Sequence, residues 1–367
     1  MADKQAAYRQ LKQDITAGTL GNLYIFHGEE TYLREYYLSE VAKKLVPPAF
    51  AAFNAHKVEG KGLTVEALTE LVEPLPMMAE RTLVQVVDMD LFKLPEGQRK
   101  ALIALLSDFP SHCCLIFVYD QLPYAPNKTV KTLCKAIDAH VSVVQFDKQS
   151  RSDLLNWVTR RCKACGKSID NQTAEHLIFT CGSLMNTLIP EIEKVCAYAK
   201  GPAVTKGDIT AVAAPVLEAQ VFDMTAALAR RDFNRSAEIL GTLLKLQEEP
   251  IMLLAVLGKE LRKLYTARLA IDNGLDKFWL MKQWNMRSDY PAKLALEAAG
   301  RVSTSWAERA VARCQALDVR MKSVTGANSA GELKQFLMEL SGIPVQVALG
   351  KHCFQGNWGQ LSHPDDL

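Results

Sequence analysis

A glycine at the end of an apolar run is the first candidate for phosphate chemistry in this chain. Residues 23–27 form a short apolar stretch that predicts a strand, and Gly28 follows it directly. A phosphate-binding loop needs Gly-x-x-x-x-Gly-Lys-Ser/Thr, because glycine amides cradle the phosphates, lysine neutralises them and the hydroxyl holds Mg²⁺. The last three positions of that pattern are here Leu33, Arg34 and Glu35. Only the first glycine is present, so the sequence predicts no working phosphate loop.

Neighbouring residues weaken the case for nucleotide chemistry further. Glu29 and Glu30 lie within the loop, where their carboxylates would repel a triphosphate. Arg34 could bind an anion at a helix N-terminus, but we expect its side chain to be solvated at the surface. Asp88 lies at the end of the third predicted strand, next to its last residue, where ATPases carry an aspartate that holds Mg²⁺. Met89 stands in place of their water-activating glutamate. Together with the glycine, Arg34 and Asp88 mark a degenerate nucleotide site that we expect to be non-functional, so no cofactor, metal or catalytic residue is predicted.

Two adjacent methionines lie between the second predicted helix and the third predicted strand. The segment reads Leu75-Pro76-Met77-Met78. Neighbours on a short connection point in different directions, so two large apolar side chains are difficult to bury together. One interpretation is that one or both methionines cap the core beneath the sheet. The other is that they project as an apolar plug into a partner's pocket, a role that suits the flexible, polarizable methionine side chain.

Four cysteines are a weaker candidate, for a metal site. Cys162-x-x-Cys165, with Cys181 and Cys196 further along, could suggest zinc. A structural zinc site usually presents paired Cys-x-x-Cys knuckles on turns. Only one such pair exists here, at the end of an amphipathic helical pattern, so we expect packing or free thiols instead.

Strand-like and helix-like segments alternate over the first 150 residues. Apolar runs predict strands at 23–27, 55–60, 82–89, 114–120 and 141–146, with helical patterns at 32–45, 64–72, 96–106 and 128–137. This alternation predicts a doubly wound α/β domain. Helical spacing then continues at 152–164, 171–181, 184–199 and 205–213, which predicts a small helical domain. Beyond residue 215 the helical patterns lie at 218–230, 233–245, 251–273, 276–284, 292–299, 303–322 and 329–340, typical of an all-α domain.

Length and composition describe an ordinary globular protein. The 367 residues predict two or three domains, and 49% hydrophobic with 23% charged residues is a common balance. A formal net charge of +2 makes no electrostatic case for a dedicated nucleic-acid binder. The densest basic cluster, Arg160-Arg161 with Lys163, is expected to be a solvated helix face, although such clusters could touch DNA or a neighbouring subunit. No secretory signal or membrane-spanning stretch is seen, so a cytoplasmic, soluble protein is expected.

Several segments, in order, resemble one family. Residues 23–41, 53–68 and 74–88 are together similar to the N-terminal domain of the delta subunit of the bacterial DNA polymerase III clamp loader. Residues 183–200 resemble its lid-domain helix, and 221–265 and 313–340 resemble its collar domain. In that family two adjacent hydrophobic residues, often Leu-Phe or Phe-Phe, precede a small residue, a polar residue and arginine. The matching positions are Met77 and Met78, with methionines in place of aromatics, followed by Ala79, Glu80 and Arg81.

The resemblance implies both an architecture and a function. It implies an AAA+-like domain with a RecA-like parallel sheet at 1–147, a helical lid domain at 148–214, an all-α collar at 215–343 and a loosely ordered tail at 344–367. It implies a non-ATPase wrench that binds and opens the sliding beta clamp during DNA replication, within a pentameric assembly. The partners would be the clamp, the motor (gamma/tau) subunits, the delta-prime subunit and primer–template DNA, with no membrane. The clamp contacts would be Leu75, Pro76, Met77, Met78 and Arg81.

Two alternatives stay open on the sequence. An atypical P-loop-related ATPase would need Arg34 to replace the phosphate-binding lysine. A motor or delta-prime subunit of the same machine should show Ser-Arg-Cys before the fifth strand, where this chain has Ala139-His140-Val141, and commonly a cysteine zinc module. On the residues seen, the chain is not expected to be catalytic by itself, although it would form part of the DNA polymerase III holoenzyme, a nucleotidyltransferase.

Overall fold

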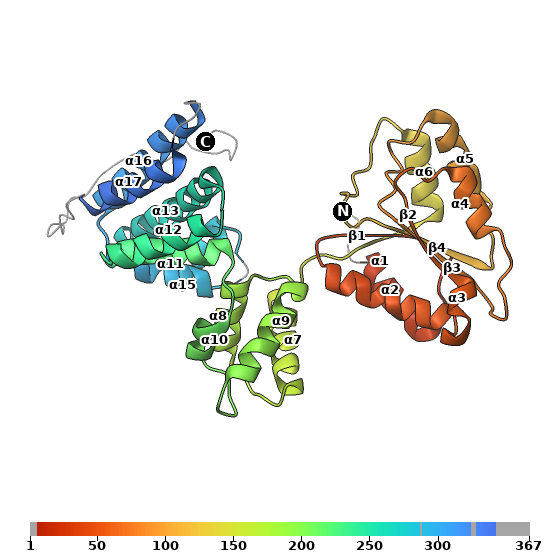
Figure 1. Ribbon diagram of the computed structural model, residues 1–367, viewed down its shortest axis with the longest axis horizontal. Helices are drawn as coiled ribbons and strands as arrows, with labels where there is room; N and C mark the ends of the chain where they lie inside the picture. The colour runs from red at the N-terminus through yellow and green to blue at the C-terminus, as the bar shows by residue number, and fades with distance from the viewer. Residues whose placement is uncertain (1–5, 287, 324–327, 343–367) are drawn as a thin grey trace. The chain divides into compact units, whose positions relative to one another are not determined.

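The computed structural model describes residues 6–286, 288–323 and 328–342. The chain divides into two compact units, with the division between Ala214 and Pro215. Figure 1 shows the elements of each unit. The tail that the sequence predicts at 344–367 lies outside the described residues.

Five parallel strands form the sheet of the first unit, in the order β2-β3-β4-β1-β5. The strands are β1 (Leu23–His27), β2 (Ala55–Glu59), β3 (Thr82–Val87), β4 (Cys113–Val118) and β5 (Ser142–Gln145). All five predicted strands are confirmed, with ends that differ by a residue or two. Parallel pairing places the carboxyl ends of all five strands at one edge, where ligands of open α/β sheets bind.

Alternating side chains divide the strands between two hydrophobic clusters, one on each face of the sheet. In β4, Cys113, Leu115 and Phe117 join one cluster, whereas Cys114 and Ile116 join the other. The first cluster packs against α4 (Val65–Val72), α5 (Glu96–Ser107) and α6 (Lys131–His140). The second packs against α1 (Ala6–Ala17) and α2 (Thr31–Leu45). Figure 1 shows these two helix layers on opposite faces, as expected for strands buried on both sides.

Three short or sparsely apolar elements were not predicted from the sequence. They are α1, the 3₁₀ helix η1 (Pro48–Phe50) and α3 (Ala51–Asn54). Helix α6 also begins and ends three residues later than the predicted 128–137. The element α3 has only four residues, which is too short to show a helical period. It nevertheless places one residue of the candidate site.

Helices α7–α10 follow the sheet and enclose a hydrophobic cluster of their own. They are α7 (Arg151–Ala164), α8 (Asn171–Cys181), α9 (Met185–Tyr198) and α10 (Lys206–Val212). Cys162, Cys181 and Cys196 are buried in this cluster, in agreement with a packing role. In the part of the chain that is described, no group of three or more potential ligands could hold a metal ion.

The second unit consists of helices around one long central helix. They are α11 (Leu217–Ala229), α12 (Phe233–Lys245), α13 (Pro250–Asp272), α14 (Lys277–Gln283), α15 (Tyr290–Ala299), α16 (Thr304–Ser323) and α17 (Ser329–Ser341). Helix α13 contacts α11, α15, α16 and α17, and the shared core is continuous. All seven predicted helices of this region are confirmed. Over residues 6–286, 288–323 and 328–342, no single helix is long and apolar enough to cross a membrane, and only α10 and α11 counted together meet that length and composition.

Candidate functional site

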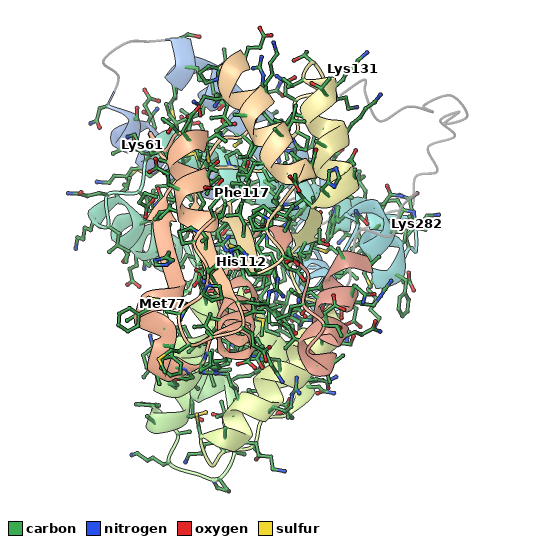
Figure 2. All side chains as sticks on the ribbon, turned by 90° about the vertical axis from the view of Figure 1, so that its right-hand side faces the viewer. Lys61, Met77, His112, Phe117, Lys131 and Lys282 are labelled. Carbon is green, nitrogen blue, oxygen red and sulfur yellow. The ribbon has the colours of Figure 1, made fainter. Side chains whose placement is uncertain are left out.

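The connection between α4 and β3 carries a group of exposed apolar side chains, residues 75–78, which we call the apolar tip. Leu75, Met77 and Met78 are 76%, 59% and 80% exposed. Figure 2 shows Met77 at the rim of the α/β part, away from the buried Phe117. The interpretation that these methionines cap the core is therefore wrong. Three large apolar side chains exposed together in one short connection are typical of an interaction surface.

The main chain of the apolar tip is bent and makes no regular structure. Pro74 and Pro76 lack an N–H, so this segment can neither extend α4 nor join the ladder of β3. Met78 adopts a φ of 54°, in the left-handed region that a non-glycine residue enters at a cost of roughly 1–2 kcal/mol. The surrounding structure must therefore hold the bend in place.

Asn54, the last residue of α3, holds the apolar tip through hydrogen bonds to the main chain of Met77. Its buried side chain accepts a hydrogen bond at Oδ1 from the N–H of Met77 (2.7 Å) and donates from Nδ2 to the carbonyl of Met77 (2.8 Å). Nδ2 also donates to the carbonyl of Phe50 (2.9 Å). Nothing in the sequence marks Asn54, because it belongs to no motif and its partner lies 23 residues away. The adjacent Phe53, likewise not predicted, is 59% exposed.

Arg81 anchors the other end of the segment, where it enters β3. Its Nη1 donates to the carbonyl of Leu20 (2.7 Å), and its Nη2 donates to the carbonyls of Gly21 (2.8 Å) and Cys113 (3.3 Å). The guanidinium is thus engaged with the chain's own backbone. This geometry assigns Arg81 a supporting place beside the apolar tip, in contrast to the exposed methionines.

At the opposite, carboxyl edge of the sheet, Gly28 serves close packing. Its φ is 123°, and a Cβ on it would lie 2.3 Å from the carbonyl oxygen of Phe146. Two hydrogen bonds join the same strand ends: Phe146 N–H donates to the His27 carbonyl (2.8 Å), and Glu30 N–H donates to the Phe146 carbonyl (3.0 Å). The loop after β1 is therefore bound to the end of β5. A glycine is needed here by this contact alone, without any phosphate.

Arg34 is buried, so the expectation that it is solvated at the surface is wrong. Its side chain is only 1% exposed. Nη1 donates to the carbonyl of Tyr119 (2.9 Å), and Nη2 forms an ion pair with the carboxylate of Asp120. The reason is tertiary: the residues that directly follow β4 reach α2 and supply both acceptors. The arginine that occupies the lysine position of a phosphate loop is thus already neutralised within the protein.

Asp88 is likewise engaged within the chain. Its Oδ1 accepts hydrogen bonds from the N–H groups of Asp120 (2.8 Å), Gln121 (3.1 Å) and Leu122 (3.1 Å). Asp88 has a φ of 58°, a conformation that aspartate tolerates better than most residues. The carboxylate caps the loop after β4, and that loop presents Asp120 to Arg34. The structure therefore brings Arg34 and Asp88 together through one loop, and each already has internal partners.

Glu30 points from the loop after β1 to the first residue of α9. Its carboxylate accepts hydrogen bonds from the Met185 N–H at 3.2 and 3.4 Å, and its side chain has no exposed surface. Burial raises the pKa of Glu30, whereas the Met185 N–H and Lys148 oppose the rise. An acidic group at a helix N-terminus is favourable. The neighbouring Glu29 instead pairs with Lys148 at 2.7 Å.

A pocket of about 1050 Å³ lies at the same edge, between the loops that follow β2 and β3. Lys61, Asp88 and Gln98 are among its lining residues. Lys93 at its border pairs with Asp90 at 2.9 Å. This pocket could not be predicted from the sequence, because it is formed by loops whose approach depends on the order of the strands in the sheet.

Comparisons with known proteins agree on one family. The family model "DNA polymerase III, delta subunit" matches residues 24–147, and the model for the C-terminal domain of that subunit matches residues 218–340. The DNA polymerase III subunit delta of Bacillus subtilis is 23% identical over 333 residues, which cover 89% of this chain and 94% of the relative. A probable subunit delta of Aquifex aeolicus is 22% identical over 88% of this chain and 84% of its own length.

A solved structure is similar as well. The "Bacillus subtilis DNA clamp loader delta protein (YqeN)" aligns with a TM-score of 0.48 and 20% identity, over 91% of this chain and 99% of that one. The two family models lie in the same order as the two compact units and together cover more than half of the chain. This chain therefore belongs to the family of DNA polymerase III delta subunits.

Proposed function

We propose that this chain binds the sliding clamp through its apolar tip and thereby holds the clamp open during DNA replication. The observation that carries the proposal is the exposure of Leu75, Met77 and Met78 on a connection whose backbone is held by Asn54. An apolar side chain that is exposed in the free protein gains stability only when a partner covers it. The pocket of a clamp would supply that cover.

The binding free energy of this interaction can be estimated from the side chains that it would bury. Full burial of one methionine contributes about 1.5–3 kcal/mol. The two methionines together could therefore contribute ~3–6 kcal/mol before the costs of association are subtracted. If the pocket is better formed in the open clamp, this energy shifts the clamp toward the open state. The chain would then act as a wrench without hydrolysing ATP.

The partners that Arg34 and Asp88 have within the chain support the non-ATPase role. Arg34 is buried and paired with Asp120, and Asp88 caps the loop after β4. An atypical ATPase would have to break the Arg34 ion pair before a phosphate could use that arginine. The alternatives of a motor or delta-prime subunit are set aside by the match to delta-subunit models.

The remaining parts suggest how the subunit is held in its assembly. We propose that residues 1–147 act as the AAA+-like domain, 148–214 as the lid and 215–343 as the collar in a pentameric ring with the motor and delta-prime subunits. In this arrangement the motor subunits bind ATP, and their rearrangement would expose the apolar tip to the clamp. Primer–template DNA would lie within the assembled complex.

The test compares clamp binding by the full chain and by Met77→Ala/Met78→Ala, using calorimetry or surface plasmon resonance without nucleotide. We expect the double substitution to weaken binding by ~100-fold, about 3 kcal/mol, because it removes most of the apolar area that the pocket would bury. Release of the clamp from closed circular DNA should be accelerated by the wild-type chain and not by the variant.

A matched control is available in the second unit. Met252 and Met338 are 57% and 71% exposed, close to the values of the tip methionines. Met252→Ala/Met338→Ala should leave clamp binding unchanged. Equal binding by the wild type and the tip variant would contradict the placement of the clamp contact. Failure of the folded wild-type chain to bind any clamp would contradict the proposed function itself.

A further inference from the structure

Asn54 makes a paired contact with the apolar tip. Its carboxamide is fully buried, and both of its ends face the main chain of Met77. A carboxamide has two N–H donors and one carbonyl acceptor. Here the donors go to the carbonyls of Phe50 and Met77, and the acceptor receives the Met77 N–H. The side chain therefore binds Met77 much as a neighbouring β-strand would.

This contact stands alone. Among the described residues, the main chain of 74–80 makes no other hydrogen bond than these two with Asn54. Arg81 fixes the segment only at its far end, through the carbonyls of Leu20 and Gly21. Between the end of α4 and Arg81, the position of the apolar tip therefore depends on one buried side chain.

Without such a hold, the apolar tip would have a lower-energy alternative. Exposed apolar side chains on a loose loop tend to collapse onto the nearest protein surface. A partner would then have to displace them, and the ordering cost would be paid on binding. A main chain held at Met77, next to the bend at Met78 with its φ of 54°, keeps the two methionine side chains presented to solvent.

We propose that Asn54 is a positioning residue for partner binding, which pre-organises the apolar tip through the main chain of Met77. The inference rests on the proposed function, because it takes the clamp as the partner. Asn54 itself is buried and touches no partner. Its effect on affinity must therefore pass through the two methionines, and that requirement makes the role separable from a merely structural one.

The experiment is a double-mutant cycle on clamp binding with the full chain. Asn54→Leu keeps the side-chain volume and removes all three hydrogen bonds. We expect it to weaken clamp binding about tenfold, because the ordering cost of the loop is added to association. In a chain that already carries Met78→Ala, the same substitution should weaken binding by about twofold or less, because less apolar surface is left to position. Hydrogen exchange of the Met77 amide should become faster in Asn54→Leu even without the clamp.

Asn328 provides the control. It is another carboxamide that supports the main chain, with Oδ1 accepting the Gly331 N–H (3.0 Å) at the start of α17, far along the chain from the apolar tip and from the acceptors of Arg81. Asn328→Leu should lower the melting temperature and leave the Kd for the clamp within about twofold. If Asn54→Leu does not fold, Asn54→Asp serves instead, since its carboxylate still accepts the Met77 N–H but repels the Met77 carbonyl.

The outcomes separate the two proposals. Suppose that Asn54→Leu binds the clamp as tightly as the wild type, whereas Met77→Ala/Met78→Ala loses clamp binding. This result would overturn the positioning role and leave the proposed function standing. An equal loss from Asn54→Leu with and without Met78→Ala would also overturn it, because the effect would then be general. Normal binding by Met77→Ala/Met78→Ala would overturn the proposed function instead.

Discussion

Replacing Arg34 by methionine should destabilise the first unit, because the arginine that lies at the phosphate-loop position has a structural role. Methionine keeps much of the aliphatic volume but loses both contacts, to the carbonyl of Tyr119 and to the carboxylate of Asp120. An unpaired buried carbonyl costs about 1–3 kcal/mol. The lost ion pair costs less, about 1 kcal/mol, because Asp120 is 43% exposed and regains water.

Part of this loss is offset, because methionine does not have to be desolvated as a guanidinium does. We therefore expect a net loss of about 2 kcal/mol. For a unit of this size that corresponds to a fall of about 4–8 °C in the melting temperature. Differential scanning calorimetry of the full chain, run on the variant and the wild type side by side, can resolve a fall of this size.

The control is Lys43→Met on the same helix. Lys43 is 64% exposed and forms its ion pair with Glu40 at the surface, so its loss should leave the melting temperature almost unchanged. An Arg34→Met variant as stable as this control would refute the view that Arg34 is a structural residue. A rise in the melting temperature with Mg-ATP that the wild type shows and Arg34→Met lacks would refute it independently, because it would show that the arginine binds phosphate.

Two further predictions concern the same edge of the sheet. Asp88→Ala should lower the free energy of unfolding by about 2–3 kcal/mol, because three N–H groups lose their acceptor and alanine is strained at a φ of 58°. Asp88→Asn keeps an acceptor and tolerates that φ, so it should lower the free energy of unfolding by less than half as much. Urea unfolding of both variants measures the difference. Glu30→Gln should remove the part of the pH dependence of the unfolding free energy that comes from this carboxyl group. Because burial raises the pKa of Glu30 in the folded state, its contribution to stability is greatest below the ordinary pKa and is lost as the pH rises through the raised value. The difference in unfolding free energy between Glu30→Gln and the wild type should therefore grow in favour of glutamine from mildly acidic to neutral pH, and a difference that stays constant would contradict the assignment.

Much of the architecture could be predicted from the sequence because its signals are local. Apolar runs bounded by breakers located all five strands, and helical spacing located the helices of both units. Helix α1 was missed because only Leu11 and Ile15 are buried among its twelve residues, which leaves little periodicity. The four-residue α3 was missed because it is shorter than the period that would reveal it.

Part of the candidate site could likewise be predicted from the sequence, and part could not. On the sequence, two methionines on a proline-containing connection marked the apolar tip as one of two interpretations, and the missing lysine and hydroxyl predicted a degenerate nucleotide site. Whether the methionines are exposed was open on the sequence, and the tertiary structure decided it.

Only the tertiary structure revealed what the polar residues do. Arg34 is buried because its acceptor Asp120, 86 residues away in the chain, lies in the loop that follows β4 and meets α2. Asn54 holds Met77 because α3 packs under the connection that precedes β3. Periodicity records which face of an element is buried and can be read locally. The partner of a buried polar group depends on which strand ends meet, and that follows from the order of strands in the sheet.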